Sequence, residues 1–331
     1  MKSNIALVTG GYTGESVVSF RSADFVESQL DRNKYNIYKI IILKEGWYFQ
    51  DADAVKHSVD KNDFSILLNN KKINFDAAFI MLHGSPGEDG KLQGYFDLLD
   101  IPYTSCDALT SSLTMNKGYS KAIVNGIKDL YIARSIQLFE NSVHAEKELE
   151  ANLDFPLFIK PNNGGSSIGM SKVKTTFELP DALKKAFIED DQVLVEEFVQ
   201  GREFSIGVFK NKKGLQVLPA TEVIPSNDFF DFEAKYTPGA TEEITPGRMT
   251  EAEKSRVERI VSEIYIKLNC KGMVRIDYFL QNQTSNFYFI EINTIPGQTE
   301  QSFIPQQVRA AGLNIAEFYG DLIEMALNTK K

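Results

Sequence analysis

Cysteine is scarce in this chain of 331 residues, since only Cys106 and Cys270 are present. Two cysteines can build neither a framework of disulfide bonds nor a cysteine-rich metal site. Basic residues are also in deficit, with 36 Lys and Arg against 45 Asp and Glu, a net charge of -9 and a pI near 5.1. Because such a chain lacks the basic field that attracts nucleic acid, we expect small-molecule substrates and no nucleic-acid partner.

Long apolar runs are missing as well. The opening sequence MKSNIALVTGG lacks the extended apolar region of a signal peptide, and no later run reaches the length of a transmembrane helix. We therefore expect no membrane partner and a reducing, cytoplasmic location. The 43% of hydrophobic residues is nevertheless enough for the cores of two or three domains.

Two common nucleotide-binding signatures are absent. In a G-x-G-x-x-G fingerprint ending at Gly14, the first glycine would fall on Thr9. The loop from Gly84 to Lys91 is one residue too long for a P-loop, and Leu92 replaces the required Ser or Thr. A phosphate site in this chain must therefore use a loop of another kind.

What the chain does contain is a pair of apolar runs near its C-terminal end, at residues 273–280 and 287–292. The polar segment between them predicts an antiparallel hairpin. Asp277 and Glu291 then approach each other from neighbouring strands, and side-chain alternation places Asn293 on the same face as Glu291. Two carboxylates and an amide oxygen are suitable ligands for magnesium.

The alternative for this hairpin is a pair of solvated acids without a function. Glu291 argues against it, because this residue lies between Ile290 and Ile292 in an apolar run, where an unpaired charge is costly to bury. The hairpin is therefore a candidate metal site.

The first hundred residues predict an open parallel sheet with helices. Residues 4–9, 37–43 and 77–82 have the composition of buried strands, and residues 15–30 carry apolar side chains at helical spacing. The third strand leads into the loop HGSPGEDG, at the end of the sheet where open α/β folds place ligands. His83, which begins this loop, is either a ligand-facing residue or an ordinary loop residue.

A second glycine loop, PNNGGSSIG at residues 161–169, follows a strand predicted at residues 157–160. Its backbone N–H groups and the hydroxyls of Ser166 and Ser167 can surround phosphate oxygens, while Lys160 supplies a charge at the entrance. A flexible surface hairpin is the alternative for this segment.

A further strand is predicted at residues 193–199, where Glu196 and Glu197 interrupt the apolar run before Gly201 and Glu203 open a new strand. Backbone amides beside a carboxylate can bind an adenine edge and then a ribose. Acids on an edge strand often do no more than keep it soluble, so both interpretations stay open.

The polar segment at residues 225–248 has the length of an active-site loop or lid, and Lys235 and Tyr236 lie in its middle. A capping-box pattern at Thr250 and Glu253 begins a helix that reaches about Leu268. Further helices are predicted at residues 105–125, where Lys117 and Lys121 lie one turn apart, and at residues 303–311 and 316–327.

Six motifs together resemble, in order and spacing, the D-alanine:D-alanine ligases of the ATP-grasp superfamily. Individually the glycine loops are weak signals, but the ordered set covers nearly the whole chain. The motifs are HGSPGEDG at 83–90, KPNNGGSSIG at 160–169, EEFVQGREF at 196–204, FEAKY at 232–236, GMVRIDYF at 272–279 and EINTIPGQTEQS at 291–302.

This resemblance implies an α/β and α+β fold, with a Rossmann-like (pre-ATP-grasp) domain at residues 1–104 and a two-lobed ATP-grasp fold after it. The central lobe would span residues 105–195, and the C-terminal lobe, residues 196–331, would carry the metal site and the lid at about 225–248. The implied reaction joins two D-alanine molecules through a D-alanyl phosphate formed with ATP, for peptidoglycan synthesis. A homodimer is expected.

The resemblance also implies which residues bind the nucleotide and its metal ions. Two Mg²⁺ ions, with Mn²⁺ as the alternative, would be held by Asp277, Glu291 and Asn293. The nucleotide contacts would come from Lys117, Lys160, Ser166 and Ser167 for the phosphates, Glu196 and the Val199 backbone for adenine, Glu203 for ribose, and Lys235 from the lid.

The same resemblance assigns the amino-acid contacts. Glu15 would bind the ammonium of the first substrate in a hydrogen-bonded set with Ser166 and Tyr236. The others would be His83 at the first carboxylate, Arg275 and the Gly297 backbone at the oxyanion, Ser302 at the second carboxylate and Phe303 beside it.

Three other activities compete with this one. A ligase that takes D-lactate or D-serine second has the same architecture, but that change accompanies replacement of the lid tyrosine, and Tyr236 is present. A silent nucleotide-binding module would be expected to lack a metal ligand or Arg275. Glutathione-type or carboxylase-type ligases fit the lobes but not the loop at residues 87–90. Two positions depart from the family pattern, Glu197 in the adenine strand and Phe303.

Overall fold

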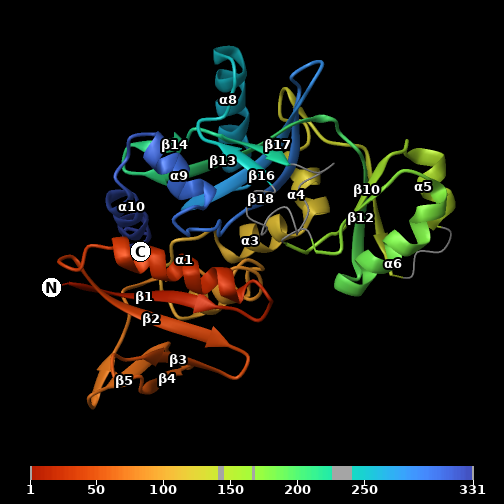
Figure 1. The fold of residues 1–331 in the computed structure, drawn as a ribbon. Coiled ribbons are helices and arrows are strands. Elements are labelled where there is room, and N and C mark those ends of the chain that lie inside the picture. Colours follow the sequence, from red (N-terminus) through yellow and green to blue (C-terminus); the bar gives the residue numbers. More distant parts are fainter. Residues whose placement is uncertain (1, 141–144, 166–167, 226–240, 330–331) are drawn as a thin grey trace.

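The computed structural model describes residues 2–140, 145–165, 168–225 and 241–329. Three β-sheets form within these residues. In Figure 1 the first sheet lies at the lower left, the third lies above it, and the second lies to the right with its own helices.

The first sheet is mixed, which corrects the expectation of a parallel sheet. Only three strands, β1 (Ser3–Gly10), β2 (Tyr35–Leu43) and β7 (Ala77–Ile80), pair in parallel, in the order β2-β1-β7. The other four pair antiparallel beyond β2: β3 (Gly46–Gln50), β4 (Lys56–Asp60), β5 (Ser65–Leu68) and β6 (Lys71–Ile73). Their connections are too short for the helical crossover that parallel neighbours need.

Helices from both ends of the chain cover the first sheet. Helix α1 (Ser16–Gln29) packs on β1, and α10 (Ile315–Leu327) packs on both α1 and β7. Large side chains such as Phe318 and Tyr319 of α10 belong to the same buried core as β1. A shorter helix, α2 (Lys91–Leu98), follows the loop at residues 83–90.

The second sheet is antiparallel, in the order β11-β10-β12-β9. Its strands are β9 (Ser135–Phe139), β10 (Leu157–Pro161), β11 (Ser171–Val173) and β12 (Gln192–Glu197). Helices α5 (Ala145–Asn152) and α6 (Leu179–Glu189), the latter preceded by a short 3₁₀ turn at Thr176–Glu178, lie beside it (Figure 1). The strand predicted at residues 193–199 ends earlier, at Glu197.

The third sheet has the order β16-β15-β13-β17-β18-β8, with β14 paired to β13. Its strands are β8 (Leu130–Tyr131), β13 (Gly201–Asn211), β14 (Gly214–Val217), β15 (Thr221–Pro225), β16 (Thr241–Ile244), β17 (Met273–Gln281) and β18 (Phe287–Asn293). Helices α8 (Glu251–Lys267) and α9 (Phe303–Ala310) contact it, and the predicted capping box of Thr250 and Glu253 begins α8.

The predicted hairpin is confirmed, because β17 and β18 pair antiparallel. Buried and half-buried residues alternate along β17, so that Ile276 and Tyr278 face the core while Arg275 and Asp277 face the other side. This alternation follows from the two-residue period of a strand. The functional candidates of the hairpin therefore share one face.

The single helix predicted at residues 105–125 is instead two, α3 (Ala108–Met115) and α4 (Lys117–Val124). Asn116 separates them with an extended backbone (φ -85°, ψ 107°), and its side chain accepts a hydrogen bond from the Tyr119 N–H at 3.0 Å. Asparagine is favoured at such a cap because its side chain satisfies an otherwise unpaired backbone donor. The break orients α4 independently of α3.

Core packing does not follow chain order. Cys106, Val124 and Leu130 lie in the core of the third sheet, together with residues of α8, β13 and β17. The division at residues 1–104, 105–195 and 196–331 stays a prediction. Within the described residues no helix combines the length and apolarity needed to cross a membrane.

Candidate active site

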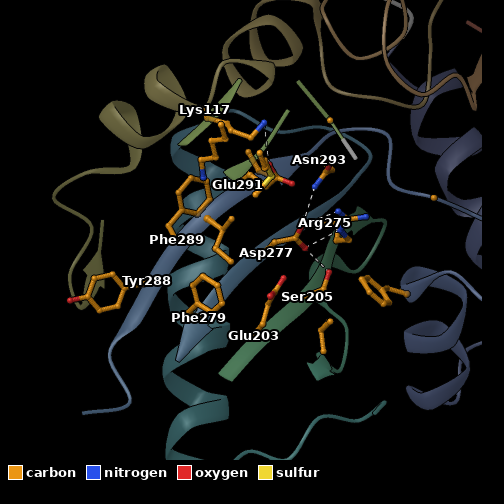
Figure 2. Close-up of a pocket in the computed structure, with 18 of the residues that line it drawn as sticks. Lys117, Glu203, Ser205, Arg275, Asp277, Phe279, Tyr288, Phe289, Glu291 and Asn293 are labelled. Atoms are coloured by element: carbon orange, nitrogen blue, oxygen red, sulfur yellow. Dashed lines mark hydrogen bonds and ion pairs between the residues drawn. The ribbon is translucent and has the colours of Figure 1, made fainter. Parts of the chain in front are cut away.

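A cleft of about 1370 Å³ lies where the three sheets meet. All the described residues that the sequence singled out line it: Glu15, His83, Lys117, Lys160, Glu196, Val199, Glu203, Arg275, Asp277, Glu291, Asn293, Gly297, Ser302 and Phe303. Ser166, Ser167, Lys235 and Tyr236 lie outside the described residues. Figure 2 shows the part of this cleft above β17 and β18.

The metal-ligand candidates are brought together by the hairpin register. Asp277 of β17 lies directly opposite Glu291 of β18, and Arg275 lies opposite Asn293. The Asn293 side chain donates to Asp277 Oδ2 at 3.2 Å, which leaves its amide oxygen for another partner. Two carboxylates and an amide thus face one space, as the alternation of side chains predicted (Figure 2).

Arg275 and Asp277 form a two-point ion pair. The Arg275 guanidinium donates from Nε to Oδ1 at 2.9 Å and from Nη2 to Oδ2 at 2.8 Å. Ser205 of β13 also donates to Oδ1, at 2.6 Å. Burial disfavours the guanidinium charge, but Asp277, together with the charges of Glu291 and Glu88, outweighs this effect and raises the pKa of Arg275 above its usual value. Arg275 therefore stays positively charged, and the Asp277 carboxylate holds its guanidinium in place.

Two lysines of α4 face two acids of the cleft. Lys117 lies 3.3 Å from a carboxylate oxygen of Glu291, and its Nζ also donates to the Gly164 carbonyl. Lys121, one turn later, contacts Glu196 Oε1, while Lys160 of β10 contacts Glu196 Oε2. Helical spacing of four residues places both lysines on the same side of α4.

The charges around Glu196 are buried. Burial by itself disfavours the carboxylate, yet Lys121 and Lys160 outweigh this and lower the pKa of Glu196 to about 2. Burial also lowers the pKa of Lys121, to about 8, against the attraction of Glu196. The sequence predicted the contacts of Lys160 and Glu196 with a ligand, but it assigned no role to Lys121.

Glu15 lies between the two glycine loops. A Cβ added at Gly84 would come within 2.7 Å of Glu15 Oε2, and one added at Gly165 within 2.8 Å of Oε1. Gly84 also has a positive φ of +69°. Both loops therefore approach the Glu15 carboxylate closely only because they carry hydrogen in place of a side chain.

His83 is fixed by the protein on both ring nitrogens. Nε2 is 3.1 Å from the Ser22 hydroxyl, and Nδ1 is 2.9 Å from the Ile295 carbonyl, so Nδ1 carries the proton. Burial lowers the pKa of His83 below its ordinary value. A neutral histidine at the cleft wall joins α1 to the segment after β18.

Glu88 is a site residue that the sequence did not single out. Burial and the charge of Glu15 raise its pKa to about 8, although its carboxylate accepts a hydrogen bond from the Gly84 N–H at 2.7 Å. The signal that could have revealed it is its place in HGSPGEDG, five residues after His83. Its unusual ionisation depends on tertiary contacts.

The segment after β18 forms the other wall. Ser302 precedes α9, and its hydroxyl accepts from the Thr299 N–H at 3.0 Å. A Cβ at Gly297 would lie 3.1 Å from that hydroxyl. The Phe303 ring lies 5.7 Å from the Arg275 guanidinium carbon, in a cation–π contact.

Glu197, one of the two residues that depart from the family pattern, has a structural role. Its carboxylate contacts Arg134 and accepts a hydrogen bond from the Asp154 N–H at 2.9 Å. It thereby ties the second sheet to the segment before β10. Phe158 and Phe198 stack beside it at a centroid distance of 6.1 Å and both line the cleft.

Comparisons with known proteins agree along the whole chain. Residues 4–106 match the family model "D-ala D-ala ligase N-terminus", and residues 128–324 match "D-ala D-ala ligase C-terminus". The chain is 44% identical over 328 residues to a D-alanine--D-alanine ligase of Bacteroides fragilis, which covers 98% of this chain and 99% of that protein.

Two solved structures extend the comparison. The VanG D-Ala:D-Ser ligase from Enterococcus faecalis has a TM-score of 0.88 and 33% identity, covering 98% of this chain and 100% of that chain. The D-alanine--D-alanine ligase from Bacillus anthracis complexed with ATP has a TM-score of 0.79 and 28% identity, covering 99% and 98%. The three-sheet architecture is therefore common to all three proteins.

Proposed function

The chain belongs to the D-alanine–D-alanine ligase family, and we propose that it joins two D-alanine molecules into D-alanyl-D-alanine at the expense of ATP. ATP phosphorylates the carboxylate of the first D-alanine, and the amine of the second displaces phosphate from that D-alanyl phosphate. The observation that carries the proposal is the convergence of the candidate contacts for both amino acids, the phosphates and a metal in one cleft.

The lysines supply the charge that the nucleotide needs. A triphosphate and two amino-acid carboxylates cannot share a cleft with Glu15, Asp277 and Glu291 unless cations compensate them. Lys117 and Lys160 lie beside the loop at residues 161–169, where Lys117 already contacts the Gly164 carbonyl. We assign the phosphates to this loop, including Ser166 and Ser167.

The hairpin fits a pair of Mg²⁺ ions. Asp277, Glu291 and Asn293 offer hard oxygen donors on one face, which suits magnesium with water and phosphate completing its shell. When bound, the ions would neutralise phosphate charge and orient the transferred group. The protein's own part is to hold these donors in register, with Ser205 and Arg275 fixing the Asp277 carboxylate.

The adenosine end of the nucleotide belongs on the far side of the cleft from Glu15. Glu196 and the Val199 backbone are assigned to adenine, and Glu203 is assigned to ribose. Phe279, which lies opposite Glu203 in the sheet, and Phe289 both line the cleft and provide apolar surface for the purine and sugar (Figure 2). Binding and orientation of this kind account for most of the catalysis in phosphoryl transfer.

The first D-alanine is assigned to the wall formed by Glu15 and His83. The Glu15 carboxylate suits an ammonium group. Neutral His83 donates from Nδ1 to the Ile295 carbonyl, and its Nε2 is hydrogen-bonded to the Ser22 hydroxyl. His83 therefore adds no charge to the subsite for the substrate carboxylate and contributes only to its shape. Ser166 and Tyr236 complete the hydrogen-bonded set that we assign to Glu15.

The second D-alanine is assigned to the wall formed by Ser302 and Phe303. Arg275 and the Gly297 N–H would stabilise the oxyanion that develops as the amine attacks the acyl phosphate. We further propose that the segment at residues 225–248 closes the cleft, with Lys235 reaching the phosphates. Closure would exclude water, which hydrolyses an acyl phosphate.

Product analysis tests the function. The protein is incubated with ATP, Mg²⁺ and equal amounts of D-alanine, D-serine and D-lactate, and the ligated products are identified by mass spectrometry. We expect mainly D-alanyl-D-alanine. Mainly D-alanyl-D-serine would favour the second candidate, which the likeness to the VanG ligase supports. ATP binding without ADP release for any D-amino acid would indicate a silent module.

Assembly and location complete the proposal. We propose a homodimer in the cytoplasm, where ATP and peptidoglycan precursors are available. Light scattering after gel filtration would test the dimer, and fractionation of cells that produce the protein would test the location. A monomer at micromolar concentration would refute the first point, and recovery with the membranes would refute the second.

A further inference from the structure

Glu196 is held by two buried ammonium groups at once. Lys121 contacts one carboxylate oxygen and Lys160 the other. The side chains of the three residues are only 5–7% exposed. One carboxylate with two cations carries an excess positive charge in a part of the protein where charges are poorly screened.

The two lysines lie on different elements of the fold. Lys160 lies at the end of β10, immediately before the loop at residues 161–169 to which we assign the phosphates. Lys121 lies on the buried side of α4. That helix is anchored at its start, where the Gly118 N–H donates to the Asn162 side chain at 2.8 Å.

A nucleotide phosphate that enters the cleft would therefore bind to Lys160 and not to Lys121. Lys160 adjoins the phosphate loop and can exchange its carboxylate partner for a phosphate oxygen. If Lys121 were absent, that exchange would leave Glu196 buried without a counterion, which is strongly unfavourable. With Lys121 present, Glu196 remains an ionised acceptor.

We propose that Lys121 is a positioning residue for nucleotide recognition, which acts through Glu196. It is the permanent counterion of Glu196, whereas Lys160 is the exchangeable one that passes to the nucleotide phosphates. Lys121 thereby keeps a carboxylate oxygen of Glu196 available for the 6-amino group of a purine. This assignment rests on the proposed function, since it takes ATP as the ligand of the cleft.

The expected consequence is a preference for 6-amino over 6-oxo purines that depends on Lys121. A 6-oxo purine offers an acceptor in place of the amine, so it meets the ionised Glu196 with acceptor facing acceptor. Lys121→Met should weaken ATP binding by about tenfold or more, because one partner of a buried charge pair is lost. Binding of ITP should weaken less, so the preference for ATP over ITP should shrink.

The experiment measures dissociation constants of ATP and ITP by calorimetry, with Mg²⁺ and without any amino acid. Lys121→Arg keeps the charge and should recover most of the ATP affinity. Lys160→Met, the matched control, should weaken ATP and ITP by similar factors, because a phosphate contact is common to both. In steady-state assays Lys121→Met should raise the KM for ATP more than it lowers kcat at saturating ATP.

Thermal unfolding will show whether Lys121→Met folds. If it does not fold, a double variant provides the test. Lys121→Met combined with Glu196→Gln removes both charges and should bind ATP about as well as Glu196→Gln alone. Wild-type affinity in Lys121→Met, or equal weakening of ATP and ITP, would overturn the proposal. So would further strong weakening in the double variant. Because no step needs D-alanine, a failure of the ligase reaction with this binding pattern intact would count against the proposed function only.

Discussion

Arg275 and Asp277 lie two residues apart on β17 and share one face of the strand, where the Arg275 guanidinium grips both carboxylate oxygens of Asp277. The pair joins a candidate oxyanion partner to a candidate metal ligand. A displacement of one side chain therefore displaces the other, which couples the two halves of the proposed reaction.

Replacement of Arg275 by lysine tests this coupling. Lysine keeps the charge but cannot form the two-point pair. We expect kcat to fall by about 100-fold or more, with a small change in the unfolding temperature. ADP release with D-alanine provides the measurement. Arg259→Lys, on the exposed side of α8, is the matched control and should leave kcat unchanged. Near wild-type kcat in Arg275→Lys would remove Arg275 from the reaction.

Glu291→Gln tests the metal assignment. The substitution removes one charge at nearly constant shape, so we expect turnover to fall by at least about 100-fold. Mg²⁺ with ATP should raise the unfolding temperature of the wild type and have little effect on the variant. The exposed Glu258→Gln on α8 should behave as the wild type does. A variant that keeps both its turnover and its response to Mg²⁺ with ATP would exclude Glu291 as a ligand.

Gly165→Ala tests the position of Glu15. The added methyl group would meet Glu15 Oε1 at 2.8 Å and must displace the carboxylate. We expect kcat/KM for D-alanine to fall between about 10- and 100-fold, because small misplacements of a binding group are costly. Gly46→Ala, whose added methyl group meets no atom within 4 Å, serves as the control. Equal kinetics in the two variants would show that Glu15 is not constrained by this loop.

The raised pKa of Glu88 predicts that the stability of the protein depends on pH in a characteristic way. Its pKa is raised from 4.5 to about 8 in the folded protein. Between these values the folded chain binds more protons than the unfolded chain, so stability contributed by Glu88 falls as the pH rises through this window. Glu88→Gln stays neutral and can still accept from the Gly84 N–H. We expect the variant to gain thermal stability over the wild type as the pH rises toward 8, with little difference near pH 4.5. A constant difference across the range would contradict the raised pKa.

Local sequence patterns were sufficient for several elements. The hairpin of β17 and β18 follows from two apolar runs around a polar turn, and its period of two places Asp277, Glu291 and Asn293 on one face. The start of α8 follows from the Thr250 and Glu253 pair. In each case, the signal lies within a few residues of the feature.

Other features were missed because their causes are not local. Residues 46–73 form four antiparallel strands that extend the first sheet, although their alternation of apolar residues is weak. Asn116 divides a run with helical composition, and nothing in the periodicity marks the break. Asparagine can occupy a helix or cap one, and here its side-chain amide also donates to Asn163 and Gln192, partners that only the tertiary structure supplies.

The sequence by itself indicated most of the acids, lysines and glycines that line the cleft, through strand alternation, turn composition and the order of its motifs, but not Lys121 or Glu88. Only the tertiary structure decided which of them meet and what charge they carry. Lys121, Lys160 and Glu196 come from three separate elements, and Glu88 meets Glu15 across two loops. Ionisation of such groups depends on burial and on charges brought together by folding, and no local pattern contains that information.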